Sequence, residues 1–213
     1  MKFFLEDAVF ILKGIGITIQ LLVGGLLIGF ILGGVFSVAR YNGIGRFIIN
    51  RLVSIIRGTP LILQLSLIYF TLPLLTGLNI SVVWAGILTF GINSSAYIAE
   101  ILRAGIESIP KGQFEVSKTL KIPPYYMWKD IILPQVLKTI LPALIGEVIT
   151  LTKETALVAT IGAMDIMRSA QVVAAAHFTY FAPLCIAGGY YYILVLTIEY
   201  IGKLLEKSHA KDQ

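Results

Sequence analysis

The chain has 213 residues, of which 57% are hydrophobic and only 14% are charged, and its mean hydropathy is +0.86. This composition excludes an ordinary soluble domain and indicates a single all-α, polytopic membrane domain over residues 1–213. The formal net charge of +5 then reports membrane topology, not nucleic-acid binding, and the lone Cys185 excludes a disulfide framework and a thiolate metal site.

Five membrane-spanning helices are predicted along the chain. Uncharged runs extend over residues 14–39, 58–99 and 169–198, and about 20 apolar residues suffice to cross the hydrocarbon. The middle run is long enough for two spans, separated near Pro73. One more span follows Pro134, although it carries ionisable residues. The predicted spans cover residues 9–39, 59–75, 80–104, 134–160 and 178–202.

The basic residues predict the orientation of these spans. Five spans place the two termini on opposite sides of the membrane, and basic residues concentrate on the cytoplasmic side. We therefore expect the N-terminus outside and the C-terminus in the cytoplasm. The side with few basic residues carries Lys2, Lys13 and Arg168, and the rich side carries Arg40, Arg46, Arg51, Arg103, Lys111, Lys118, Lys121, Lys129, Lys203, Lys207 and Lys211.

A charged, turn-rich segment at residues 105–134 interrupts the apolar sequence and must lie outside the hydrocarbon. The Pro123-Pro124 pair breaks it into two short helices that suit docking on a soluble partner. The segment resembles the cytoplasmic coupling loop of ATP-binding-cassette (ABC) importer permeases, whose pattern is Glu-Ala-Ala, three residues, Gly, nine residues, Ile-x-Leu-Pro. The positions that match are Glu115, Ile131, Leu133 and Pro134; those that depart are Val116 and Ser117 for the alanines and Lys121 for the glycine.

Other motifs narrow the resemblance, which covers residues from about 14 to 205. The sequence Arg57-Gly58-Thr59-Pro60 is similar to the Arg-Gly-Thr-Pro signature of permeases for polar amino acids of the histidine, arginine and glutamine type. The same residues predict a helix start, with Thr59 as N-cap and Pro60 in the first position. Two further segments look like this subfamily: residues 96–106, and Glu147-Val148-Ile149 followed by Lys153-Glu154-Thr155.

The resemblance implies the fold of a type I ABC importer and a subunit that is not an enzyme. No stretch fits the P-loop pattern Gly-x4-Gly-Lys-Ser/Thr, so ATP and Mg are expected on a separate chain, with no cofactor or metal in this one. The implied partners in the cell inner membrane are two ATPase subunits, a second and preferably identical permease chain, an extracytoplasmic substrate-binding protein and the lipid bilayer. Transport would follow alternating access. The ATPase-coupling residues expected are Glu115, Val116, Ser117, Leu120, Lys121 and Pro123.

Polar residues inside the spans indicate a substrate site. Each ionisable group costs roughly 2.5–3.5 kcal/mol to insert, so such groups usually face a cavity or a partner. Glu147, Thr150 and Glu154 share one helix face by their spacing, and Asn93, Tyr97 and Glu100 share another. Because carboxylates pair with guanidinium and ammonium groups, we expect a basic amino acid: arginine, lysine or histidine. The expected contacts are Glu154, Glu147, Asn93, Gln64 and Thr155.

Several alternatives stay open at this stage. In one alternative, Glu147 does not contact substrate; it pairs with Lys153 or with a residue of another span and only stabilises helix packing. Asp165 and Arg168 form an outer gate, a contact for the binding protein, or a weak surface ion pair. The repeat Gly25-x-x-x-Gly29-x-x-x-Gly33 allows close helix approach within the chain or between chains. Further gate or structural candidates are Arg57, Glu100 and Arg103.

Two other classes of function compete with the importer. An ion- or proton-coupled secondary amino acid transporter also places carboxylates at mid-membrane, but such folds often show paired halves with matching broken helices, and no such repeat occurs in the sequence. A membrane-embedded enzyme needs a constellation of nucleophiles and acid–base groups near one leaflet, and the sequence offers none.

Overall fold

The computed structural model describes the backbone of residues 2–210 and the side chains of residues 5–207. Lys211, and the side chain of Lys2, lie outside the described residues. Within residues 2–210 the chain is helical and contains no strand. The helices are α1 (Lys2–Lys13), α2 (Ile15–Tyr41), α3 (Arg46–Gly58), α4 (Leu61–Ser66), η1 (Leu67–Thr71), α5 (Leu72–Thr76), α6 (Val82–Glu107), α7 (Lys111–Thr119), α8 (Pro124–Tyr126), η2 (Met127–Ile132), α9 (Leu133–Glu154), η3 (Thr155–Ile161), α10 (Ile166–Ala176) and α11 (Phe181–Ala210).

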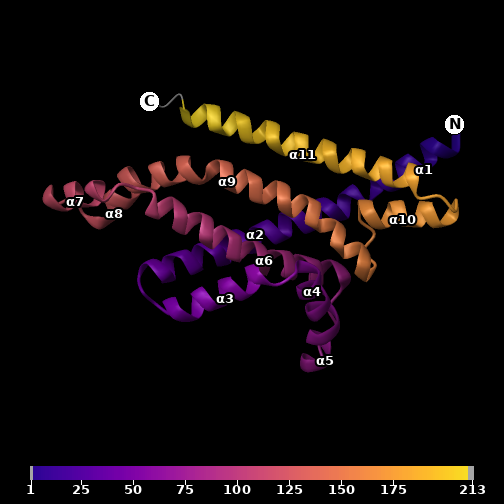
Figure 1. Ribbon diagram of the computed structural model, residues 1–213, viewed down its shortest axis with the longest axis horizontal. Coiled ribbons are helices and arrows are strands. Elements are labelled where there is room, and N and C mark those ends of the chain that lie inside the picture. Colours follow the sequence, from indigo (N-terminus) through magenta and orange to yellow (C-terminus); the bar gives the residue numbers. More distant parts are fainter. Residues whose placement is uncertain (1, 211–213) are drawn as a thin grey trace.

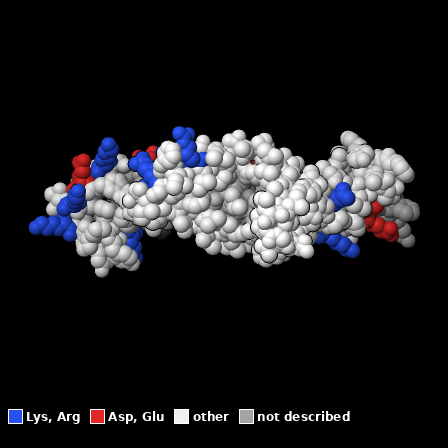
Figure 2. Space-filling model, turned by 90° about the horizontal axis from the view of Figure 1, so that it is seen from below, with Lys and Arg blue, Asp and Glu red and all other residues white. Residues whose placement is uncertain are grey.

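The long helices α2, α6, α9 and α11 run along the long axis of the molecule (Figure 1). Helices α7 and α8 lie at one end of this axis, and α1 and α10 lie at the other (Figure 1). Figure 2 shows charged side chains toward both ends of the visible face, with an uncharged band between them. This pattern matches a bundle whose long axis crosses a bilayer.

Four helical segments are long and apolar enough to cross a membrane: Leu5–Tyr41, Val82–Glu107, Pro124–Ile161 and Phe181–Lys207. A fifth span exists if the pair Arg46–Gly58 and Leu61–Thr76, which is bent by 103°, counts as one. The predicted span at 59–75 corresponds to the second member of this pair, Leu61–Thr76, but the prediction did not include the first member. It missed α3, because Arg46, Arg51 and Arg57 interrupt the apolar residues there and leave no uncharged run.

The junction between α3 and α4 differs from the predicted helix start. Thr59 is extended and ends α3, and its hydroxyl donates to the Ile55 carbonyl over 2.9 Å. Pro60 is the N-cap residue of α4, since its carbonyl accepts from the backbone N–H groups of Leu63 and Gln64. Thr59 thus caps the end of one helix and not the start of the next.

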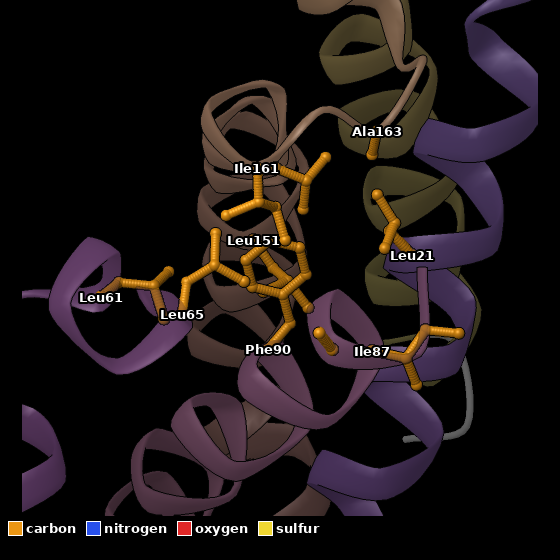
Figure 3. Packing of buried hydrophobic residues seen from close by; sticks show 10 residues of the cluster. Leu21, Leu61, Leu65, Ile87, Phe90, Leu151, Ile161 and Ala163 are labelled. Atoms are coloured by element: carbon orange, nitrogen blue, oxygen red, sulfur yellow. The ribbon is translucent and has the colours of Figure 1, made fainter. Parts of the chain in front are cut away.

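The largest core cluster joins α2, α4, α6, α9 and η3 (Figure 3). Phe90 of α6 is fully buried in it, together with Leu21 of α2, Leu65 of α4 and Leu151 of α9. Lipid tails are as apolar as these side chains, so helix association inside a membrane depends on close packing and polar contacts. The shape of this cluster therefore matters more than its apolar area.

Close approach of α2 to α6 depends on the glycine repeat in α2. A Cβ atom added to Gly25 would lie 2.9 Å from the Phe90 Cβ, and one added to Gly33 would lie 2.9 Å from both the Ile98 Cβ and the Ser95 carbonyl oxygen. At Gly29 the added atom would lie 3.0 Å from the Ser94 Cβ. The repeat therefore serves helix packing within this chain.

We expect Gly33→Ala to destabilise the folded protein, because the new methyl group meets backbone as well as side-chain atoms of α6. Overpacking of this kind costs about 1–3 kcal/mol. Thermal unfolding in detergent measures the effect. Gly16→Ala on the same helix is the matched control, since a Cβ there meets no atom within 4 Å; equal melting temperatures for the two variants would contradict the assignment.

Candidate functional site

A polar cluster connects α4, α6 and α9 in the interior of the bundle. The Asn93 amide Nδ2 donates to Gln64 Oε1 over 3.3 Å, and the neighbouring Ser94 hydroxyl donates to Glu147 Oε1 over 2.6 Å. The Gln64 Nε2 in turn donates to the Ile56 carbonyl at 2.7 Å. Consecutive residues of α6 thus connect one polar side chain on α4 with one on α9.

Glu147 and Glu154 form an acidic pair on α9. They lie seven residues apart, which places them about two turns apart on one face of the helix. Glu147 is held by Ser94 of another span rather than by Lys153. Glu154 is partly exposed and has no hydrogen bond or ion pair within residues 5–207. It is therefore free to receive a cationic group.

Thr155 does not join this cluster. Its side chain is fully buried, and its hydroxyl donates to the Thr152 carbonyl over 2.7 Å. In this conformation it stabilises the turn from α9 into η3 instead of lining an accessible site.

Glu100 is the centre of an ionic network near the α7 end of α6. Its carboxylate contacts Arg40 of α2 at 2.6 Å, Arg103 one turn further along α6 at 2.9 Å, and Arg57 of α3 at 3.7 Å. The side chains of Glu100 and Arg40 are only 18% and 12% exposed. One carboxylate thus ties three helices together.

Arg57 connects this network to the polar cluster. Its guanidinium lies over the Tyr97 ring, 5.2 Å from the centroid, and it is close enough to Glu147 to attract that carboxylate. The spacing of Asn93, Tyr97 and Glu100 along α6 thus gives a continuous polar face from the Gln64 amide to the Glu100 network.

Asp165 and Arg168 do not form the surface ion pair that was one of the predicted alternatives. Asp165 is fully buried and is the N-cap of α10: its carboxylate accepts from the Arg168 backbone N–H at 2.8 Å and from the Tyr191 hydroxyl at 2.9 Å. Burial raises the pKa of Asp165, and these hydrogen bonds oppose the rise. The Arg168 guanidinium instead reaches Gln171 at 3.4 Å. Asp165 therefore joins α10 to α11.

The loop between α6 and α9 presents a mostly exposed helix at one end of the molecule. Glu115 and Val116 in α7 and Leu120 directly after it are exposed, whereas Ser117 in α7 is buried and donates to the Gln113 carbonyl over 2.7 Å. The exposed Pro123 precedes the second short helix, which begins at Pro124. Lys121 is exposed as well. Five of the six expected coupling residues are thus on an accessible surface, and the sixth, Ser117, faces inward.

Lys121 adopts the left-handed conformation, with φ of 53°. The Ile122 N–H donates to the Ser117 carbonyl and the Lys121 N–H donates to the Lys118 carbonyl, which is the hydrogen-bond pattern of a Schellman turn. Glycine is the usual residue in such a turn because it adopts positive φ without steric cost. Lysine at this position thus keeps the turn that ends α7.

Sequence reasoning missed three residues of these sites: Ser94, Arg40 as a partner of Glu100, and Tyr191. Ser94 gave a weak signal, because it follows Asn93 in a run of small and polar residues on an apolar helix. The sequence contains no signal for the other two contacts, since Arg40 lies 60 residues from Glu100 and Tyr191 lies 26 residues from Asp165.

The chain resembles a known protein family and several named proteins over most of its length. Residues 25–210 match the family described as "Binding-protein-dependent transport system inner membrane component". The chain is 46% identical to an arginine transport system permease protein, ArtQ, of Bacillus subtilis over 200 residues, covering 93% of this chain and 91% of that protein. It is 42% identical to a protein of Rickettsia typhi named as a glutamine transport system permease, GlnP, over 206 residues, covering 96% and 94%.

Solved structures show the same arrangement of helices. A crystal structure of an amino acid ABC transporter with histidines superposes with a TM-score of 0.88 at 33% sequence identity, covering 96% of each chain. An inward-facing structure of the MetNI methionine ABC transporter has a TM-score of 0.73 at 21% identity, covering 93% of this chain and 94% of that one. The second likeness concerns the fold alone.

Proposed function

Since this chain belongs to the family of binding-protein-dependent transport inner membrane components, and is the permease subunit of an ABC amino acid importer, we propose that its substrate is a basic amino acid. The type I importer fold predicted from the sequence is confirmed by the solved structures. The family consists of translocation components, not enzymes, and the comparisons give no support to the alternative of an ion-coupled secondary transporter.

The observation that carries the proposal is the unpaired Glu154 carboxylate beside Glu147. Two ionised carboxylates on one face of a span are costly inside the membrane, and a bound cation lowers that cost. An arginine, lysine or histidine side chain supplies that cation, and Arg57 and Lys153 supply only part of the compensation. In this proposal Glu154 and Glu147 contact the substrate's side chain, while Asn93 and Gln64 border the site.

Replacing Glu154 by Gln tests the substrate assignment. The change keeps size and polarity and removes the charge, so we expect uptake of arginine to fall at least tenfold while uptake of glutamine changes little. A charge-assisted hydrogen bond is worth about 1.5–3 kcal/mol, which corresponds to roughly 10–150-fold. Competition between the two labelled amino acids in vesicles that hold equal amounts of permease measures the ratio.

Glu199→Gln is the matched control, because it removes a partly exposed carboxylate from another long helix, α11, outside the polar cluster. Equal loss of arginine and glutamine uptake in Glu154→Gln would show that Glu154 supports the fold or the transport cycle and does not select a cation. The family assignment would stand in that case.

We propose further that α7 and the exposed turn after it dock on an ATPase subunit, and that the complex holds two such subunits, which bind ATP and Mg. The charge pattern supports an orientation with the N-terminus outside and the C-terminus in the cytoplasm, because the basic residues concentrate at the α7 end. The extracytoplasmic binding protein then meets the α10 end. A second, identical permease chain completes the conduit; the projecting α5, with Leu74 and Leu75 84% and 79% exposed, offers it an apolar surface.

Alternating access follows from this assembly. The ATPases close on ATP and carry α7 with them, and the rigid contact between α2 and α6 transmits the motion to the polar cluster. The Glu100 network lies between α7 and the cluster, and it is well placed to hold α2, α3 and α6 together while α9 moves. Hydrolysis returns the site to the cytoplasm.

A further inference from the structure

A basic cavity lies where α2 and α6 end, close to the start of α3. It has a volume of about 210 Å³, and its polar walls include Arg40, Arg46 and Arg103, with Glu107 at one side. Arg40 and Arg103 share Glu100, and Arg103 also pairs with Glu107. Three guanidinium groups thus meet two carboxylates, and within residues 5–207 Arg46 has no ion pair. The cavity keeps an excess positive charge.

The first turn of α3 adds to this positive field. Its N-cap is Gly45, which provides no side-chain hydrogen bond, and the first backbone N–H that bonds back to it belongs to Ile49. The backbone N–H groups of Arg46, Phe47 and Ile48 therefore have no carbonyl acceptor within this 13-residue helix. The positive end of the helix dipole therefore lies beside the Arg46 side chain, which favours an anion.

An apolar groove continues from the basic cavity along the bundle. Its volume is about 360 Å³, and it is lined by apolar side chains of α2, α6, η2 and α9, among them Val38, Leu102 and Val136. Ser37, Tyr41 and Ile106 line both the cavity and the groove, so the two spaces adjoin at these residues. Together they form a cleft with a cationic end and an apolar end.

Two details describe the place where the cavity meets the groove: its position relative to the membrane surface and its polarity. Tyr41 and Trp128 pack edge to face with ring centroids 4.9 Å apart, and such aromatic residues concentrate at the membrane–water interface. The Ser37 side chain is only 7% exposed and makes no hydrogen bond within the described part of the chain, although it borders both spaces. The Ser37 hydroxyl is therefore available to a ligand that occupies either space.

We propose that this cleft binds one anionic phospholipid. The phosphate lies among Arg46, Arg103 and Arg40, the Ser37 hydroxyl donates to a phosphate or ester oxygen, and one acyl chain fills the groove. The charge of the cavity selects an anion, and the adjoining groove selects an anion that carries a hydrocarbon chain. Basic pockets between spans have this chemistry of headgroup recognition. The Trp128 ring, which lines the groove, also packs against Phe114 of α7 with ring centroids 6.2 Å apart, so one side chain separates the bound lipid from that helix.

Native mass spectrometry of the full-length chain, purified in detergent and titrated with lipid, tests the proposal. Phosphatidylglycerol and phosphatidylcholine with the same acyl chains are compared with glycerophosphoglycerol, the headgroup without chains. We expect phosphatidylglycerol to bind at least fivefold more tightly than phosphatidylcholine. Arg46→Gln lowers its affinity about fivefold, which is the change expected for about 1 kcal/mol per basic residue.

Two further variants separate charge from shape. Arg51→Gln is the charge control, because Arg51 lies on the same helix over the Phe47 ring and not in the cavity; it leaves the affinity unchanged. Gly34→Leu fills the groove at a position where an added Cβ meets no atom within 4 Å, so it weakens phosphatidylglycerol without unfolding the chain, which its melting temperature verifies.

Four results would overturn the proposal: equal binding of the two lipids, equal loss in Arg46→Gln and Arg51→Gln, a headgroup that binds as tightly as the whole lipid, or a dimer that takes up no phosphatidylglycerol. The third result would identify a small-anion site, and the fourth a surface covered by a second copy of the chain.

Discussion

Reversing the charge of Glu115 is expected to abolish ATP-driven uptake while the permease itself stays folded. Glu115 is exposed on α7, and its side chain makes no ion pair or hydrogen bond within residues 5–207. Arginine also has a high helix propensity, so Glu115→Arg preserves the helix. If Glu115 pairs with a basic group of the ATPase, Glu115→Arg brings two positive charges together at that interface. This repulsion costs about 2–5 kcal/mol, which weakens association about 30-fold or more.

Co-purification of the ATPase through a tag on the permease measures this effect, with the ATP hydrolysis rate of the eluate as readout. Glu6→Arg carries the same change of charge at the other end of the molecule from α7, and it should retain the ATPase. Normal ATPase recovery and uptake in Glu115→Arg would remove Glu115 from the docking surface, whereas loss in both variants would point to a general effect of charge.

Glu100→Gln is the second large expected effect, and it acts on stability. The variant leaves Arg40, whose side chain is 12% exposed, without the carboxylate that neutralises it, and Arg57 and Arg103 lose the same partner. Breaking a buried ion pair by removing one member costs about 3–5 kcal/mol. Because Glu100 is 18% exposed, we expect a loss near the lower end of that range.

Thermal or denaturant unfolding in detergent measures the loss, and Glu107→Gln supplies the comparison. Glu107 also contacts Arg103, but its side chain is 59% exposed, so its removal should cost less than about 1 kcal/mol. A stability of Glu100→Gln equal to that of Glu107→Gln would show that the network is solvated and does not hold α2, α3 and α6 together.

The sequence predicted the long spans well, because most of them contain a long uncharged run, and the span at 134–160 is mostly apolar despite its ionisable residues. It failed at α3, whose three arginines hide an apolar face, and at Thr59, where a cap for the end of one helix resembles a cap for the start of the next. Local patterns could not decide these two cases, because the answer depends on the 103° bend between neighbouring helices.

The pairings of the candidate site residues could not be predicted from the sequence. The i, i+3 and i+4 spacing correctly placed Glu147 and Glu154 on one face, since helix periodicity alone determines this. Which side chain meets Glu147 depends on the packing of α9 against α6, and the answer was Ser94. Asp165 likewise looked like a surface residue, because its partner Tyr191 comes from a different helix.

ATP-dependent uptake by the reconstituted complex tests the central claim most directly. The permease is placed in proteoliposomes with its ATPase inside and its binding protein outside, and accumulation of labelled arginine is followed with ATP, without ATP, and with an imposed proton gradient alone. We expect accumulation only when ATP and the binding protein are both present. Uptake that follows the proton gradient and ignores ATP would contradict the account.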